Sequence, residues 1–305
     1  MDVALVDVDS HNFPNLVLMK LSAWHKARGD TVTLLTAAEI LRMEKPLERY
    51  NKIYGACIFT GQDWLISLLE AIGVHVAGSG TNRQEILPYE IEHIRPDYSL
   101  YDITDTAYGF LTRGCPRRCP FCIVSRKEGA TSRKVADVSE WWQNEPHIKL
   151  MDPNILACAD HLDLLRQLVD TRAYIDITQG LDARLLTEEN IELIDAMKIK
   201  ILHFAWDNPS DKSVPEALEN FSHRSKIKDH RKLAVYVLTN YNSTHEQDLE
   251  RIYWLRDNGF SPYVMVYDKT EASDRTKQLQ RWVNSKQIFH KVAKFEDYVA
   301  RKEPA

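Results

Sequence analysis

The sequence predicts an α/β protein in which a partial (β/α)6 barrel follows a small doubly wound layer. Short runs rich in β-branched residues alternate with amphipathic stretches along the 305 residues, the pattern of parallel strands joined by helices. Residues 105–270 carry six such units, fewer than the eight that close a full barrel. The sheet of the second part is therefore expected to remain open.

The first 80 residues form the smaller layer. Helical spacing of apolar residues predicts helices over Leu16–Arg28 and Asp63–Ile72, each with a glycine at or just after its end. Apolar runs predict the strands, which are Val3–Val8, Thr31–Leu35, Lys52–Phe59 and Val74–Ala77.

A break falls after this layer, and residues 81–104 are expected to be a linker. The segment begins with polar residues, Pro88 and Pro96 interrupt it, and a turn pattern follows Pro96. The expected division is therefore 1–80, 81–104, 105–270 and a helical extension over 271–305.

The second part opens with a strand and repeats the strand–helix unit. The expected strands are Ala107–Leu111, Lys149–Met151, Tyr174–Ile177, Lys200–Ala205, Leu233–Leu238 and Pro262–Val266. The clearest helical patterns between them are Ala159–Val169, Glu188–Ala196 and Thr244–Asn258. Trp282 and Phe289 belong to an amphipathic pattern that we expect to cover the open edge of the barrel.

Composition limits the class of protein. A 44% hydrophobic content supports real cores, and a net charge of −5 argues against a general polyanion binder. No apolar run is long enough to span a bilayer, and the N-terminus lacks the basic segment of a signal peptide. We expect a cytoplasmic protein without membrane association, in which clustered cysteines indicate metal binding more than a disulfide.

Three cysteines lie on the loop that follows the first strand of the second part. Three residues separate Cys115 from Cys119, and two separate Cys119 from Cys122. Thiolates suit zinc, copper or iron–sulfur clusters, but structural zinc needs a fourth ligand, and Cys57 and Cys158 are distant in sequence and lie in apolar surroundings. The spacing favours a cluster with one iron left open, and a zinc site or plain core cysteines are the alternatives.

With the aromatic Phe121 just before the last cysteine, this loop resembles the signature of the radical S-adenosylmethionine superfamily. The resemblance covers residues 105–270, because that family also places the loop after the first strand of a partial six-unit TIM-like barrel. It implies a 4Fe–4S cluster that binds S-adenosylmethionine, cleaves it reductively and so abstracts a hydrogen atom from a substrate. It also implies a reductant such as flavodoxin or ferredoxin, and Phe121 stacked near the adenine.

The resemblance assigns further cofactor contacts to strand ends. Asp152 and Asn154 follow the second strand, where relatives hold the methionine amine through a Gly-Gly-Glu type motif that is missing here; a turn or helix cap is the alternative. Asp207 replaces the glutamate of a Glu-Ser pair after the fourth strand, and Asn240 follows the fifth. These residues are expected to bind S-adenosylmethionine.

The third strand ends in polar residues that face cofactor or substrate in similar proteins. Gln179, Asp182 and Arg184 are the candidates. Asp182 and Arg184 can equally pair with each other as a structural salt bridge.

The first layer more loosely resembles the Rossmann-like cobalamin-binding domain of a branch of the superfamily. Asp9 and His11 match that domain's Asp-x-His-x-x-Gly signature, but Pro14 stands in place of the glycine. Cobalamin ligated by His11 is thus possible but not expected, and the alternative is a scaffold or substrate-gating domain.

The substrate stays open. Basic residues near the cysteines can steer an RNA or phosphorylated substrate or form a solvated face, and a small molecule is equally compatible. The alternatives to a radical enzyme of unidentified substrate are a non-catalytic iron–sulfur or zinc protein and a cobalamin-dependent methyltransferase. A methylthiotransferase is disfavoured because the first layer holds only Cys57 of the second cysteine set that such an enzyme needs. The basic residues near the cysteines are Arg117, Arg118, Arg126, Lys127, Arg133 and Lys134.

Overall fold

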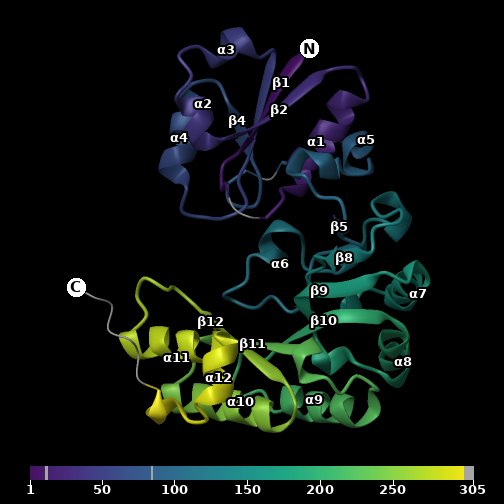
Figure 1. The fold of residues 1–305 in the computed structure, drawn as a ribbon, viewed down its shortest axis with the longest axis vertical. Helices are drawn as coiled ribbons and strands as arrows, with labels where there is room; N and C mark the ends of the chain where they lie inside the picture. The colour runs from purple at the N-terminus through teal and green to yellow at the C-terminus, as the bar shows by residue number, and fades with distance from the viewer. Residues whose placement is uncertain (11–12, 84, 299–305) are drawn as a thin grey trace.

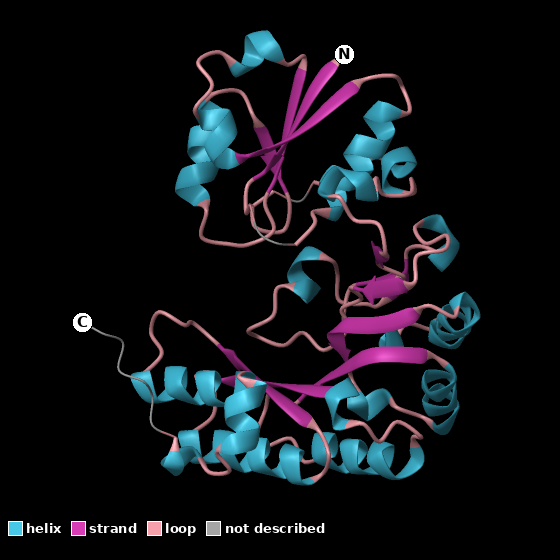
Figure 2. Ribbon diagram, in the orientation of Figure 1, coloured by secondary structure: helices cyan, strands magenta, loops and turns pink. Residues whose placement is uncertain are grey.

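Two parallel β-sheets, one in each lobe of the molecule, organise the fold (Figures 1 and 2). The computed structural model describes residues 1–10, 13–83 and 85–298. The N-terminal lobe contains a four-stranded sheet and the second lobe a six-stranded one. This arrangement confirms the predicted α/β class.

The N-terminal sheet has the strand order β2-β1-β3-β4, with all its pairs parallel. Helices cover both faces, α1 with α5 on one side and α2 with α4 on the other (Figure 1). The strands are β1 (Asp2–Asp7), β2 (Thr31–Thr36), β3 (Lys52–Ala56) and β4 (His75–Ala77). The helices are α1 (Leu16–Lys26), α2 (Ala37–Leu41), α3 (Pro46–Arg49), α4 (Asp63–Ala71) and α5 (Tyr89–Glu92).

Strand β1 shows why this layer needs a continuous apolar run. Val3 and Leu5 pack with α1, whereas Ala4 and Val6 pack with α2 and α4, and all four are fully buried. A strand covered on both faces has no polar face, as expected for a doubly wound sheet. The predicted Rossmann-like layer is thus confirmed.

The strand predicted over Lys52–Phe59 ends at Ala56. The carboxylate of Asp9 accepts hydrogen bonds from the backbone N–H groups of Ile58 (2.6 Å) and Phe59 (3.3 Å). A side chain from the β1 loop therefore takes the place of a neighbouring strand, and the chain leaves the sheet early.

The segment predicted as a linker is packed against the first lobe. It contains α5 and a 3₁₀ turn at Tyr98–Tyr101. Lys20 on α1 forms an ion pair with Glu92 (2.9 Å), and Ser22 donates a hydrogen bond to Asp97 (2.6 Å). The residue limits of the four expected segments remain predictions.

The second sheet has the order β12-β11-β10-β9-β8-β5, in which six parallel strands follow one another in chain order. Both ends of this row are edges, which confirms the open, partial-barrel arrangement. The strands are β5 (Thr106–Gly109), β8 (His147–Leu150), β9 (Tyr174–Leu181), β10 (Lys198–Ala205), β11 (Leu233–Thr239) and β12 (Ser261–Val266). The helices between them are α7 (His161–Thr171), α8 (Glu188–Ala196), α9 (Ser213–Arg224) and α10 (His245–Asp257).

Apolar residues on alternate positions of these strands pack under the helices. Ile175 and Ile177 of β9 and Val235 and Val237 of β11 are fully buried in one core with residues of α7 to α9. Successive side chains point to opposite faces of a strand, so the residues between these positions belong to the concave face of the sheet. That face carries polar and aromatic side chains.

Strand β9 continues four residues beyond the predicted end at Ile177. Gly180 adopts a φ of 98°, and the pairing of β9 with β10 shifts register before Leu181. A bulge of this kind lets a strand continue after its apolar alternation has ended, which hides the extension from the sequence pattern.

The C-terminal helices α11 (Asp274–Asn284) and α12 (Lys286–Lys291) cover the edge strand β12. Trp282 is fully buried against Val264 and Phe289, in agreement with the expected role of this segment. The Asn284 side chain accepts a hydrogen bond from Val264 N–H (2.8 Å) and donates one to Val264 C=O (3.0 Å). A helix amide thus pairs with the outer edge of the sheet.

Of the helices that the structure describes, none is both long and apolar enough to cross a membrane.

Candidate active site

A two-stranded ribbon closes the base of the cysteine loop. Strands β6 (Thr112–Arg113) and β7 (Arg133–Lys134) pair antiparallel on either side of it. Just above the ribbon, Cys115 N–H donates to Gly129 C=O (3.1 Å), and Arg113 forms an ion pair with Glu128 (2.9 Å). The loop is therefore a closed hairpin whose tip carries the other two cysteines.

Gly114 permits the turn that leads into Cys115. Its φ is 87°, in the left-handed region that glycine adopts freely. A Cβ at this position would lie 2.3 Å from Thr131 C=O and 2.9 Å from Gly129 C=O. The two arms of the loop thus approach too closely for any other residue at position 114.

Asp152 anchors the segment that enters the loop. Its buried carboxylate accepts hydrogen bonds from Leu111 N–H (2.9 Å), Thr112 N–H and the Thr112 hydroxyl. Burial raises the pKa of this carboxyl to about 7, although the three hydrogen bonds favour the ionised form. Asp152 was expected to contact S-adenosylmethionine, but its carboxylate is already hydrogen-bonded to Leu111 and Thr112.

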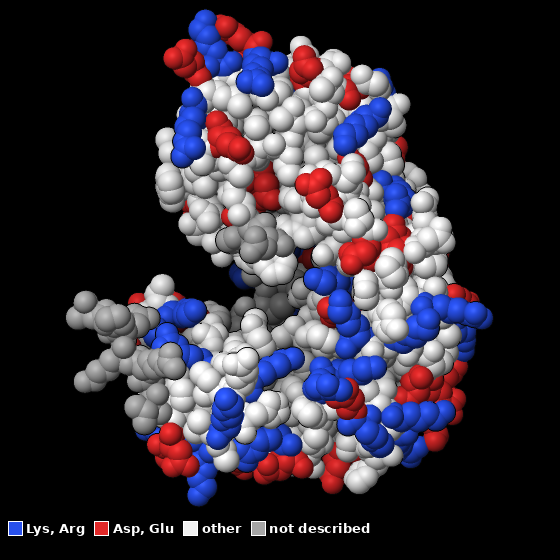
Figure 3. Space-filling model, in the orientation of Figure 1, with Lys and Arg blue, Asp and Glu red and all other residues white. Residues whose placement is uncertain are grey.

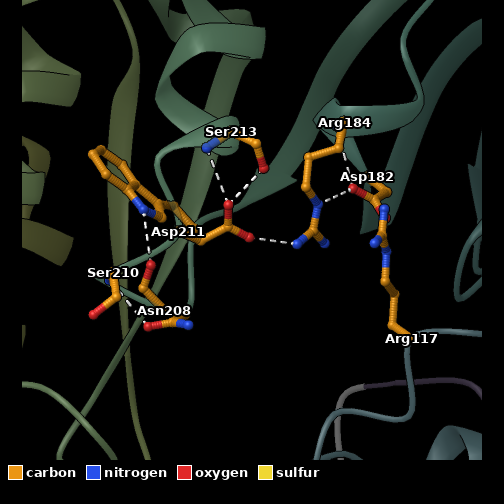
Figure 4. Close-up of polar contacts among 8 residues, drawn as sticks. Arg117, Asp182, Arg184, Asn208, Ser210, Asp211 and Ser213 are labelled. Atoms are coloured by element: carbon orange, nitrogen blue, oxygen red, sulfur yellow. Dashed lines mark hydrogen bonds and ion pairs between the residues drawn. The ribbon is translucent and has the colours of Figure 1, made fainter.

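A chain of alternating charges ties the loop to the ends of β9 and β10 (Figure 4). Arg117, between the first two cysteines, pairs with Asp182, which is 6% exposed. Asp182 also binds Arg184 (2.7 Å), and Arg184 binds Asp211 (2.7 Å). The salt bridge between Asp182 and Arg184, one of the two alternatives from the sequence, is therefore present.

A second anchor comes from the N-terminal lobe. On the short helix α6 (Val124–Lys127), which follows Cys122, the Lys127 ammonium donates to Thr81 C=O (2.5 Å). The cysteine loop lies between the lobes, and the space-filling view shows the molecule hollowed there (Figures 1 and 3). Both lobes thus contribute to the surroundings of the cysteines.

The three cysteines are free and partly exposed. Burial raises the pKa of the Cys119 thiol, and the negative charge of nearby Asp207 adds to the effect. Among the described residues, no three His, Cys, Asp or Glu side chains are grouped so as to hold one metal ion. In a cuboidal cluster each thiolate binds a different iron, so the donor chemistry fits a cluster without such convergence.

Asn154 lies beside the first cysteine. Its amide nitrogen is 3.5 Å from Cys115 Sγ, and its Oδ1 is buried with no hydrogen-bond partner in the described chain. A buried, unpaired amide oxygen is costly unless a ligand uses it. Asn154 therefore offers an acceptor at the place where the sequence suggested one.

Asp207, at the end of β10, lies near Cys119 in a largely buried position. Burial raises the pKa of its carboxyl to about 6, while the charges of Arg251 and Arg184 oppose the shift. Arg251 is 2% exposed and donates to the carbonyls of Trp206, Asp207 and Leu238 and to the carboxylate of Asp248. It holds the ends of β10 and β11 together.

Aromatic rings gather at the ends of β11 and β12. Phe121 meets Tyr241 edge-on with 5.4 Å between ring centroids, and Tyr241 meets Tyr267 at 4.9 Å. Asn240, with a φ of 61°, donates from its amide to Tyr267 C=O (2.9 Å). Phe121 thus belongs to an aromatic group at the barrel mouth. The sequence analysis did not predict that Tyr241 and Tyr267 would join it.

The remaining expected residues divide between exposed and engaged positions. Gln179 is exposed, and no hydrogen bond of its side chain occurs within the described ranges. His11, the expected cobalamin ligand, lies outside the described residues. Sequence reasoning missed Arg251 and the anchoring role of Arg117, because Asp182 and the carbonyls that Arg251 binds are distant in the chain and leave no local pattern.

The carboxyl edge of the N-terminal sheet is where the resemblance would place cobalamin. Gly78 and Gly80 follow the last strand of this sheet, where a corrin ring would need a close approach to the backbone. A Cβ on Gly78 would lie 2.2 Å from Cys57 C=O, and one on Gly80 would lie 2.4 Å from Phe59 C=O. The chain's own backbone fills the space beside both glycines. They do not fit the role of a cradle for a corrin ring.

Comparisons with known proteins agree with the fold. No protein-family model matches the chain. It is 26% identical over 212 residues to the ribosomal protein uS12 methylthiotransferase RimO of Syntrophobacter fumaroxidans, a match that covers 67% of this chain and 43% of that protein. The chain thus spans less than half the length of this curated relative.

The fold is similar to that of the radical S-adenosylmethionine methyltransferase TsrM of Kitasatospora setae, solved with cobalamin and a 4Fe–4S cluster bound. The TM-score is 0.60 at 13% identity, over 87% of this chain and 72% of that one. The fold of this chain is thus similar to that of a radical S-adenosylmethionine enzyme, and its relative in sequence is a methylthiotransferase.

Proposed function

We propose that this chain is an enzyme that binds a 4Fe–4S cluster through Cys115, Cys119 and Cys122 and S-adenosylmethionine beside it. When bound, these groups supply reductive cleavage of S-adenosylmethionine and, from it, abstraction of a hydrogen atom from a substrate. The observation that carries the proposal is the anchored loop, which holds three free thiols at the mouth of an open parallel barrel. Ligand sites lie at this end of parallel sheets.

Asn154 is proposed to accept a hydrogen bond from the cofactor's amine. Its buried Oδ1 lacks a partner, and its amide nitrogen donates toward Cys115 Sγ, which stabilises a thiolate. Asp207 is proposed as a second acceptor, because its carboxylate lies near Cys119 at a strand end. Asp152 is better suited to holding the loop, since all its hydrogen bonds go to Leu111 and Thr112.

The aromatic group is proposed to hold the adenine. Phe121, Tyr241 and Tyr267 surround the strand ends beside the loop, and the two tyrosines are about 40% exposed. Asn240 orients this wall through its bond to Tyr267 C=O and retains its Oδ1 for the cofactor. Asp182 and Arg184 act on the loop through Arg117, and Gln179 stays a candidate for substrate contact.

We propose no role for cobalamin in this chain. The Asp9 carboxylate already accepts hydrogen bonds from the backbone N–H groups of Ile58 and Phe59. Gly78 and Gly80 pack against the backbone of Cys57 and Phe59, which leaves no space beside them for a corrin ring. The N-terminal lobe is instead proposed as a scaffold that closes one side of the site. Absence of corrin absorbance after incubation with hydroxocobalamin and desalting is expected, and stoichiometric retention would contradict it.

The experiment that tests the function is anaerobic reconstitution followed by reaction with S-adenosylmethionine and dithionite. We expect about four irons per chain and formation of 5′-deoxyadenosine. Cys119→Ala is expected to lose both, whereas Cys158→Ala, which removes a buried cysteine of the core, keeps both. Zinc in air-purified protein, or no deoxyadenosine from a reducible cluster, would instead favour a non-catalytic metal protein.

Asn154→Ala separates cofactor binding from cluster binding. Loss of a hydrogen bond to a charged amine costs about 1.5–3 kcal/mol, so the affinity for S-adenosylmethionine should fall at least tenfold while the iron content stays unchanged. An unchanged affinity would contradict the role of this residue.

A further inference from the structure

One row of polar and aromatic side chains crosses the concave face of the six-stranded sheet. Tyr108 of β5 is paired with Lys149 of β8, and Lys149 with Asp176 of β9. At the other end of the sheet, Tyr236 of β11 is paired with Tyr263 of β12. The strand neighbours of Lys149, Asp176 and Tyr236 are apolar residues that pack under the helices.

Asp176 is the central group of this row. It is 8% exposed, and its Oδ1 is buried without a hydrogen-bond partner in the described structure. Ile175 and Ile177 on either side belong to the helix-covered core, so the carboxylate faces the concave side. No carboxylate benefits from burial unless a donor or a cation reaches it.

His203 of β10 lies beside Asp176 and does not satisfy it. Its Nδ1 is 3.7 Å from Asp176 Oδ1 and donates instead to Ile177 C=O at 2.9 Å. Because a carbonyl can only accept, Nδ1 carries the proton and Nε2 of the neutral ring is an acceptor. Carboxylate and imidazole therefore present two acceptors on the same part of the face.

A wall of rings continues from His203 to the open side of the sheet. His203 stacks on Tyr236, with 5.0 Å between centroids and 10° between planes. Tyr236 meets Tyr263 edge-on at 5.7 Å, and Tyr263 and Met265 are 44% and 45% exposed. The wall is thus accessible from the β12 side, although its inner end is largely buried.

Lys149 acts on Asp176 only from a distance: its positive charge, like that of Lys200, opposes the rise that burial causes in the pKa of this carboxyl. It lies opposite Asp176 in register, yet no ion pair within 4 Å joins them among the described residues, and the Lys149 ammonium lies over the ring of Tyr108 (5.4 Å). The row therefore keeps an uncommitted acceptor next to an aromatic wall. Such a combination suits a protonated nitrogen attached to a flat apolar body.

We propose that this row is the substrate subsite of the enzyme and that it binds a ligand carrying a protonated amine, held by Asp176 and His203, with an aromatic body against Tyr236 and Tyr263. The proposal rests on the proposed function, for which it names the substrate class. The row lies one residue before the ends of β5 and β8, three before the ends of β11 and β12, and five before the end of β9. The ligand would therefore extend from the interior of the barrel toward the cysteine loop.

The test is binding of tyramine to the full, cluster-reconstituted chain, measured by calorimetry, with 4-ethylphenol as the probe that lacks the amine. Tyramine should bind at least tenfold more tightly than 4-ethylphenol. Asp176→Asn should remove this difference, while Asp170→Asn, an exposed acid on α7, should preserve it. Lys149→Met should strengthen tyramine binding by removing a like charge.

Equal binding of the two probes, no binding of tyramine at millimolar concentration, or an unaffected Asp176→Asn variant would overturn the proposal. If Asp176 served only as a partner of Lys149, the two substitutions would change stability and leave the preference for the amine intact. A far-UV spectrum and a melting curve of each variant exclude loss of fold. Binding of tyramine does not depend on cleavage of the cofactor. The subsite proposal can therefore fail while deoxyadenosine still forms, and tyramine can bind while no deoxyadenosine forms.

Discussion

Substitution of Gly114 by alanine tests how the cysteine loop is built. The new Cβ would lie 2.3 Å from Thr131 C=O, and atoms in this position do not approach below 3.0 Å, so the two arms must separate by about 0.7 Å. Overpacking of this kind costs about 1–3 kcal/mol, and the left-handed backbone adds about 1–2 kcal/mol for alanine. The sum is about 2–5 kcal/mol at the residue next to Cys115.

Gly259 supplies the matched control. Its φ of 81° is close to the 87° of Gly114, but a Cβ there meets nothing within 4 Å. Gly259→Ala should thus show only the backbone cost of about 1–2 kcal/mol in urea unfolding. Gly114→Ala should lose more stability and also most of its iron after reconstitution.

The refuting result is specific. If the two variants lose the same free energy of unfolding and Gly114→Ala still binds about four irons, the contact with Thr131 does not constrain the loop. An iron content that falls equally in both variants would also contradict the reasoning, because Gly259 lies on a distant turn after α10.

Three further predictions concern the strand ends and the sheet edge. Burial raises the pKa of Asp207 from 3.8 to about 6, so the folded chain retains a proton that the unfolded chain releases. The free energy of unfolding should therefore fall by about 2 kcal/mol as the pH rises from 4 to 6, and Asp207→Asn should remove that share in urea titrations at the two pH values. If the free energy of unfolding of Asp207→Asn falls as steeply with pH as that of the unsubstituted chain, Asp207 is not the source of the pH dependence. Arg251→Met should cost about 3–5 kcal/mol because it leaves the Asp248 carboxylate buried and unpaired, and adding Asp248→Asn should recover part of the loss; additive losses would argue against a coupled pair. Asn284→Ala should speed hydrogen exchange at Val264 and cost about 1 kcal/mol, and unchanged exchange would show that the helix amide does not protect this edge.

The alternation of apolar runs and helical patterns was sufficient to predict the fold. It located all four strands of the first sheet and all six of the second, because strands that are buried under helices consist mainly of apolar residues. It failed where a single distant side chain decides the outcome. The third strand ends early because Asp9 takes the next two amides, and the ninth continues because Gly180 allows a bulge.

The candidate site was predictable only in part. The cysteine spacing and Phe121 are local features, and the sequence therefore located the loop. Asp152, Asp182 and Arg251 each have at least one partner between 13 and 65 residues away, and those contacts, which tie separate strands together, lie in no sequence window. The subsite around Asp176 was missed because a single acid within an apolar strand resembles ordinary variation until the strands are aligned.

The anchors of the cysteine loop constrain when the chain can bind the proposed cluster. Thr81 precedes the loop, whereas Asp152 and Asp182 follow it and belong to the second and third strand–helix units. Contacts of such sequence separation form only after the intervening chain has been synthesised and has collapsed. A ribosome-bound chain that stops before Asp182 should therefore take up cluster poorly, and maturation of the metal centre should follow folding of the first half of the barrel.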